Sequence, residues 1–207
     1  MPTNRTRLAG LAVLAATAWL GVTPSAGAED IVSQYTSADL DKCRKFAVIQ
    51  IDEETEHGAS WECKGVAGYR VVVSDEDART TVSVGRTVKA AGKEPAASEG
   101  FAAFNSTRDT IEWRSVKGAD KPFAIIQRWS VADYDAKGEQ RKSRQPLIVT
   151  RLPPGKVCHV AYVDAALNDA NLLARQAADQ FARGFKCGKD QIHIVGARGR
   201  AIALTKE

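Results

Sequence analysis

The sequence lacks a long hydrophobic run, a dense cysteine pattern and the common motifs of catalysis. No apolar stretch reaches the roughly 18–20 residues that a membrane-spanning helix needs, which excludes a polytopic membrane protein. Four cysteines among 207 residues are too few for a disulfide-dense miniprotein. The chain has no G-x-S-x-G elbow, P-loop, G-x-G-x-x-G loop or H-E-x-x-H pair, so no catalytic or cofactor site is predicted from a motif.

The first 28 residues have the pattern of a secretory signal peptide. Arg5 and Arg7 supply a positive start, and Leu8 to Leu20 form an uncharged apolar core of 13 residues. Ala26-Gly27-Ala28 then provides a small-x-small cleavage site. We therefore expect residues 1–28 to be removed, with an uncleaved N-terminal anchor helix as the alternative.

Removal of this segment takes away two arginines and no acidic residue, which lowers the formal net charge from +4 to +2. A nearly neutral chain gives no reason to expect nucleic acid as a partner. We expect residues 29–207 to form one domain, periplasmic or secreted, with no membrane span after cleavage. Residues 85–100 are rich in small residues and are interpreted as a loop, a candidate seam in the domain, with a short helix around Glu99–Phe104.

An even number of cysteines in an exported chain predicts disulfide bonds. All four lie after the signal segment: Cys43, Cys63, Cys158 and Cys187. Three connectivities are available, and we favour Cys43–Cys63 with Cys158–Cys187. Structural zinc sites usually contain close C-x-x-C pairs, which this sequence lacks, so a zinc site is the weaker alternative, together with free thiols.

The second pair of cysteines has a geometric argument in its favour. Lys156 to Val163 has the pattern of a strand, and Asn168 to Lys186 has the pattern of a helix. A helix that packs back antiparallel on its strand ends near the start of that strand. This arrangement would bring Cys187 to Cys158.

Most of the remaining chain alternates apolar and polar residues, as in a sheet with one solvated face. Tyr69, Val71 and Val73, for example, share one face of a strand. Lys45–Ile51 and Trp61–Lys64 are expected to form a hairpin with two of the cysteines near its base. We therefore predict an α+β fold: an antiparallel sheet of about seven to nine strands, covered in part by one long C-terminal helix and stapled by two disulfides.

Two acidic stretches are candidate metal sites that we interpret as turns. The first contains Asp52, Glu53, Glu54, Glu56 and His57. A contiguous acidic run rarely places its ligands at the angles that a divalent metal needs. Asp75 and Asp77 resemble the start of a calcium loop, but Thr80 and Arg86 stand where the glycine and the glutamate of such a loop belong. No metal site is predicted.

Two histidines are candidates for an enzyme with an unfamiliar site. His159 and His193 are both expected in strands. A lone histidine in a strand is more often structural, and nothing in the sequence brings serine, histidine and aspartate together. Catalysis by either histidine is therefore the alternative to a non-enzymatic role.

A basic cluster is expected beside the turn at residues 134–138. Its members are Lys137, Arg141, Lys142 and Arg144. The cluster could meet an anionic polymer or an acidic partner. No aromatic residue is interleaved to stack on bases or sugars, which favours a solvated surface instead.

Two runs of sequence resemble a group of exported alphaproteobacterial proteins without an assigned activity. The first is Trp61-x-Cys63-x-Gly65-x-x-Gly68-Tyr69-x-Val71-x-Val73-Ser74-x-x-Asp77-x-Arg79, and the second is Cys158-His159-x-x-Tyr162-Val163-Asp164-Ala165 before an alanine-rich helix. The resemblance implies a bacterial envelope protein and supplies no catalytic residue. We interpret the first run as a folding motif, with a ligand patch of Trp61, Tyr69 and Arg79 as the alternative.

The expected function is that of an exported, non-enzymatic binding or interaction protein. Its partner would be another envelope or secreted protein, and the sequence does not indicate an oligomeric state. The alternatives are an enzyme that uses His159 or His193 and a structural component of the envelope. The export signal, the disulfide pattern and the missing catalytic motifs favour the first of these.

Overall fold

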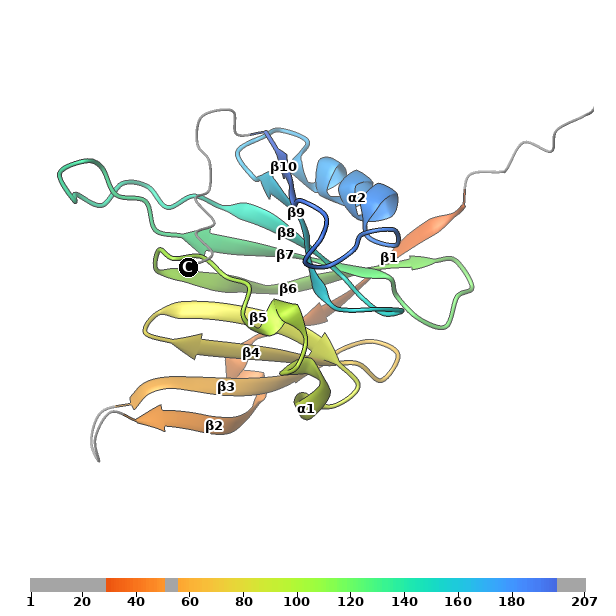
Figure 1. Ribbon diagram of the computed structural model, residues 1–207, viewed down its shortest axis with the longest axis horizontal. Helices are drawn as coiled ribbons and strands as arrows, with labels where there is room; N and C mark the ends of the chain where they lie inside the picture. Colours follow the sequence, from red (N-terminus) through yellow and green to blue (C-terminus); the bar gives the residue numbers. More distant parts are fainter. Residues whose placement is uncertain (1–28, 51–55, 197–207) are drawn as a thin grey trace, which may run out of the picture.

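The structure is a computed structural model that describes residues 29–50 and 56–196 (Figure 1). The expected signal segment, residues 1–28, lies outside the described residues, as do Asp52, Glu53 and Glu54 of the acidic run. Within the described part, no helix combines the length and the apolar character that crossing a membrane requires.

Within residues 29–50 and 56–196, ten strands form one sheet in the order β10-β9-β8-β7-β6-β5-β4-β3-β2, and β1 pairs with β6 beside this path (Figure 1). The strands are β1 (Ile31–Ser37), β2 (Arg44–Gln50), β3 (Glu56–Lys64), β4 (Arg70–Glu76), β5 (Arg79–Gly85), β6 (Asn105–Val116), β7 (Ala124–Val131), β8 (Pro146–Arg151), β9 (Cys158–Asp164) and β10 (His193–Val195). Most neighbours are antiparallel, whereas β9–β10 and the β5–β6 contact are parallel. A mostly antiparallel sheet is thus confirmed, but it has ten strands rather than seven to nine.

The additional strand is β1, which the sequence pattern does not reveal. Its sequence, IVSQYTS, is mostly polar, and no residue in it is fully buried. The strand pairs along the C-terminal half of β6, from Ile31 opposite Val116 to Ser37 opposite Thr110. Backbone pairing rather than burial of an apolar face therefore creates this strand.

Helix α2 (Ala170–Phe181) has 12 residues, so the prediction of a long helix over residues 168–186 is wrong at both ends. Before the helix, the Asp164 carboxylate accepts a hydrogen bond from the amide of Ala166 at 2.9 Å, which forms a turn. After the helix, Gly184 disfavours further helical structure. The buried face of the helix is made of small residues: Ala170, Ala174, Ala177 and Ala178.

The segment 85–100 crosses from β5 to β6 and contains two short helical turns. These are α1 (Val88–Ala91) and a 3₁₀ turn, η2 (Pro95–Ala97); another 3₁₀ turn, η1 (Leu40–Lys42), precedes β2. The helix expected around Glu99–Phe104 is absent, because the helical turns lie earlier in the segment. Both turns of the segment contact β5.

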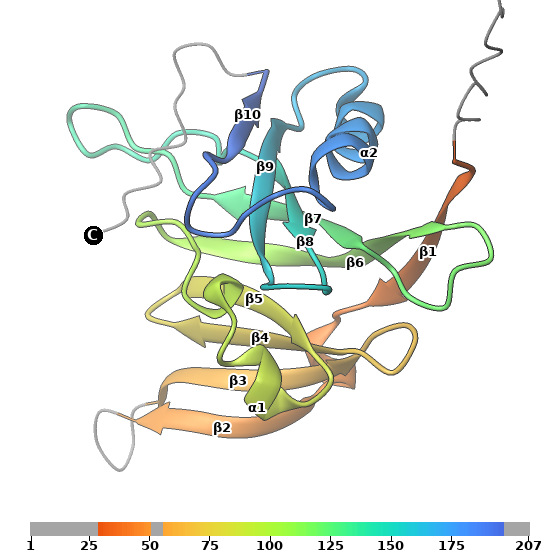
Figure 2. The ribbon, with the colours of Figure 1, turned by 45° about the vertical axis from the view of Figure 1, so that its right-hand side comes forward.

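Two hydrophobic cores lie on opposite faces of β7–β9. The first contains Ile125, Ile148 and Tyr162 from these strands, and the second contains their sequence neighbours, as the alternation of strand side chains requires. The sheet bends between β5 and β6, so that β4 and β5 contribute side chains to the first core together with β7–β9 (Figure 2). Trp113 lies in this core with no exposed surface, and the Tyr69 ring stacks on it at 6.3 Å. Helix α2 covers the second core.

Asn105 holds the bend, because β5 and β6 meet at the register pair Arg79–Asn105. The Asn105 side chain is almost fully buried. Its Oδ1 accepts a hydrogen bond from the amide of Thr80 at 3.1 Å. Its Nδ2 donates to the carbonyls of Phe101 at 3.3 Å and Ala103 at 3.0 Å. A buried amide with all its polar atoms paired is well suited to fix one geometry at this joint.

Both expected disulfides are present. Cys43–Cys63 joins the residue before β2 to β3, with Cα atoms 4.7 Å apart. Cys158–Cys187 joins the start of β9 to the chain after α2, with Cα atoms 5.8 Å apart. One disulfide therefore lies in the half of the bent sheet formed by β2–β5, and the other lies in the half formed by β6–β10.

Replacement of Asn105 by alanine should lower the free energy of unfolding by about 2–4 kcal/mol, because it leaves one amide and two carbonyls without partners at a buried joint. Chemical denaturation followed by tryptophan fluorescence measures this loss. Asn168→Ala is the matched control, since Asn168 is exposed, and should change stability by less than about 0.5 kcal/mol. Equal stability of the two variants would show that Asn105 does not hold the bend.

Candidate functional site

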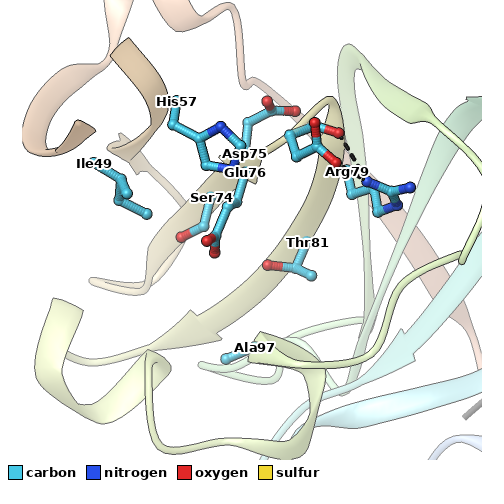
Figure 3. A pocket seen from close by; sticks show the side chains of 9 residues that line it. Ile49, His57, Ser74, Asp75, Glu76, Arg79, Thr81 and Ala97 are labelled. Carbon is cyan, nitrogen blue, oxygen red and sulfur yellow. Dashed lines mark hydrogen bonds and ion pairs between the residues drawn. The ribbon is translucent and has the colours of Figure 1, made fainter. Parts of the chain in front are cut away.

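A polar groove of about 490 Å³ lies at the hairpin end of β2–β5 (Figure 3). It is lined by Ile49, His57, Ser74, Asp75, Glu76, Asp77, Arg79, Thr81 and Ala97. The residues come from the end of β2, the start of β3, the β4–β5 hairpin and η2. We call this depression the Arg79 groove.

Arg79 is held firmly at the side of this groove. Its guanidinium pairs with the carboxylate of Asp77 and donates from Nε to the carbonyl of Ala102 at 2.8 Å. The guanidinium carbon also lies 4.8 Å from the centre of the Phe104 ring, in a cation–π contact. Arg79 and Thr81 line a second depression of about 470 Å³ as well, which extends the groove toward residues 98–102.

The three carboxylates of the groove have different environments. Asp77 pairs with Arg79, and Asp75 accepts a hydrogen bond from the Thr80 hydroxyl at 2.7 Å. Glu76 is exposed, and its carboxylate makes no ion pair or hydrogen bond with the described residues. Glu76 is therefore the carboxylate of this groove that remains available to a ligand.

The turn between β4 and β5 sets the direction of these side chains. Asp77 and Ala78 both have positive φ, 51° and 56°, as in the tight turns that favour hairpins. Beside the turn, the hydroxyl groups of Ser60 and Ser74 lie 2.9 Å apart across β3 and β4. The resulting surface combines a free carboxylate with strand hydroxyl groups.

The structure does not gather Trp61, Tyr69 and Arg79 into one patch. Tyr69 has only 2% of its surface exposed and belongs to the first core, with the Arg86 guanidinium 4.0 Å from its ring centre. Trp61 is half-buried, and the Lys45 ammonium lies 5.3 Å from its ring. Arg79 alone of the three lines the groove. The sequence motif therefore mixes a core residue with surface residues.

His159 has acid–base neighbours but lies in the interior. The His159 side chain has 1% of its surface exposed, and its Nδ1 lies 2.7 Å from the Tyr162 hydroxyl. Glu99 accepts a hydrogen bond from the His159 backbone amide at 2.6 Å, and the same carboxylate oxygen lies 4.0 Å from Nδ1. Burial lowers the pKa of His159 to about 3 and raises the pKa of Tyr162. The imidazole is thus neutral, and its contact with Glu99 is not an ion pair.

His193 lies elsewhere and has a different environment. Its ring stacks on Phe181 at 3.8 Å, beside the second core. His159 instead contacts Trp129 edge-on at 6.0 Å in the first core. The two histidines therefore do not contribute to a common site.

The candidate metal ligands that the structure describes do not come together in one site. Among the described residues, no group of three His, Cys, Asp or Glu side chains could hold a metal ion. His57 lines the Arg79 groove, and Glu56 pairs with Lys45 at 2.9 Å. Asp52, Glu53 and Glu54 lie outside the described residues.

The basic hairpin forms around the expected turn. Gly138 has a φ of 80°, and Tyr134 pairs with Gln140 across the turn. Arg144 pairs with Asp133 at 2.9 Å and is half-buried, whereas Arg141 and Lys142 are exposed. Arg144 thus has a structural partner, and the anionic partner of this hairpin stays a prediction.

The chain matches no protein-family model, and no curated protein or solved structure is significantly similar to it. The resemblance to exported alphaproteobacterial proteins therefore stays a prediction.

The buried, neutral His159 predicts acid sensitivity. Its folded-state pKa of about 3 lies below the ordinary value of 6.5, so the unfolded chain binds more protons between these values. The folded state is therefore not penalised by the burial of a charged His159 above about pH 6.5, and it loses stability through this group as the pH falls toward 3. Lowering the pH from 7 to 4.5 should cost about 2–3 kcal/mol through this group.

Urea denaturation at the two pH values measures this loss in the native sequence and in His159→Gln, which should lack it. His57→Gln is the matched control and should keep it. An NMR titration in which the His159 imidazole gains a proton above about pH 5 would contradict the prediction.

Proposed function

We propose that the protein is an exported, non-enzymatic binding protein that docks a positively charged segment of another protein in the Arg79 groove. The observation that carries the proposal is the free carboxylate of Glu76 in an open groove whose other charged groups are already paired. An unpaired carboxylate can form a new ion pair with a cationic partner, whereas charges that are already paired contribute little new interaction energy.

The composition of the groove supports a protein ligand. Acidic side chains outnumber arginine three to one along its lining, which favours a cationic partner. Ser74 and Thr81 add hydroxyl groups that can donate and accept hydrogen bonds. Ile49 and Phe104, with 40% and 44% of their surfaces exposed, offer apolar contacts beside the polar ones. Mixed surfaces of this kind are typical of non-obligate protein interfaces.

The position of His159 supports a non-enzymatic role. General acid–base catalysis requires the histidine to reach the substrate within hydrogen-bond distance. Glu99 and Tyr162 are the groups that come closest to forming a proton relay with His159. The imidazole ring that they contact has almost no exposure to solvent. We therefore assign this cluster to stabilisation of the first core.

Affinity capture on the protein's own envelope fraction tests the proposal. The mature, oxidised protein should retain a partner with a basic surface. Glu76→Lys should reduce its recovery about tenfold, because the new like charge opposes docking. Glu139→Gln, at an exposed position outside the lining of the groove, is the control and should retain the partner as the native protein does. Equal recovery of the partner by Glu76→Lys, or recovery of no partner at all, would contradict the proposal.

A further inference from the structure

A separate depression, of about 450 Å³, lies at the opposite end of β3 and β4, beside the Cys43–Cys63 disulfide. It is lined by Ser37, Lys42, Cys43, Arg44, Glu62, Cys63, Lys64 and Arg70. Four cationic side chains thus surround one carboxylate. We call this depression the basic pocket. It lies at the start of β4, whereas the Arg79 groove lies at its end, roughly 20 Å away at about 3.3 Å per residue.

The disulfide explains why these charges meet. Cys43 stands between Lys42 and Arg44, and Cys63 stands between Glu62 and Lys64. Side chains alternate along a strand, so the neighbours of Cys63 point away from the core that Cys63 joins. The covalent bond therefore holds the two charged flanks side by side on the outer face.

Two arginines bind the single carboxylate of the pocket from different sides. Arg44 donates to Oε2 of Glu62 from Nε at 3.0 Å and also from Nη2. Arg70 Nε lies 3.3 Å from Oε1. The terminal Nη1 and Nη2 groups of Arg70 have no hydrogen-bond partner among the described residues. Since a guanidinium has five N–H donors, Arg70 retains donors for a second anion.

Lys64 adds a positive charge that the described part of the chain does not compensate. It lies directly opposite Arg70 in the β3–β4 register, on the same face. Its ammonium makes no ion pair or hydrogen bond with the described residues. Like charges directly opposite each other destabilise a sheet, so an anion between them would relieve the repulsion.

Lys42 does not belong to the functional part of the pocket. It pairs with Asp39 at 2.6 Å, and this hydrogen bond raises the pKa of Lys42. The cations available to a ligand are thus Arg44, Lys64 and Arg70, against the single charge of Glu62. The excess positive charge of these three cations over the Glu62 carboxylate matches the negative charge of a phosphate group. The planar guanidinium groups also match the geometry of phosphate oxygens.

We infer that the basic pocket binds a phosphate group, through Arg70 and Lys64 with Arg44 at its edge. The phosphate could be free or part of a lipid headgroup, because both present the same oxygens. The site is independent of the proposed partner in the Arg79 groove, since the two depressions share no lining residue.

Titration of the mature, oxidised protein with inorganic phosphate, followed by ¹H–¹⁵N NMR, tests the inference. Saturable shifts should centre on Lys64 and Arg70, with a dissociation constant of about 1 mM or tighter. Lys64→Gln should weaken binding about tenfold. Lys121→Gln, which removes the same charge at an exposed position outside the lining of the pocket, should leave it unchanged.

A third variant should have the opposite effect on phosphate affinity. Glu62→Gln removes the competing carboxylate and frees both arginines, so it should tighten phosphate binding several-fold. Vesicles of phosphatidylcholine with phosphatidic acid identify the source of the phosphate. Cosedimentation that Lys64→Gln abolishes would assign the site to a lipid headgroup, whereas shifts with free phosphate alone would assign it to a soluble ligand. No binding to either probe, or equal binding by Lys64→Gln and Lys121→Gln, would overturn the inference.

Discussion

Each half of the bent sheet is closed by its own disulfide, and the surfaces described here depend on that constraint. β2 lies at one end of the sheet, pairs with β3, and has no fully buried residue, so packing alone holds it weakly. Cys43–Cys63 ties this strand to β3. Each such bond contributes about 2–4 kcal/mol, largely through its effect on the unfolded chain. Without it, the outer face of β2–β4 would lose its fixed arrangement of charges.

Asn105 supplies the second constraint, the bend that separates β2–β5 from β6–β9. Because the two halves pack face to face, the inner faces of β4 and β5 form one core with Trp113. The outer face of the first half is left with unpaired charges at its two ends. Glu76 lies at the hairpin end and Lys64 at the disulfide end. This separation of charge gives a physical basis for two independent ligands, a cationic segment and a phosphate.

Local pattern predicted what depends on neighbours in sequence. The β2–β3 hairpin and both disulfide pairs follow from period-two alternation and cysteine spacing. The strand β1 was not predicted, because it forms through its pairing with β6, which is distant in sequence, and not through its own composition. The motif residues Trp61, Tyr69 and Arg79 share a sequence run but not an environment, since alternation and the bend place Tyr69 in the core. Ser74 and Glu76 were missed in the groove, although their position on the polar face of β4 was readable. The basic pocket was missed because it also depends on the β3–β4 register, which places Lys64 opposite Arg70.

We propose that this chain leaves the reducing cytosol and becomes a binding protein with two disulfide bonds. Intact-mass analysis of natively produced protein, before and after reduction and alkylation, tests it most directly. We expect a chain that begins at Glu29, carries four hydrogen atoms fewer than its reduced form, and takes up alkylating reagent only after reduction. Recovery of the full-length chain with four thiols that react at once would contradict it.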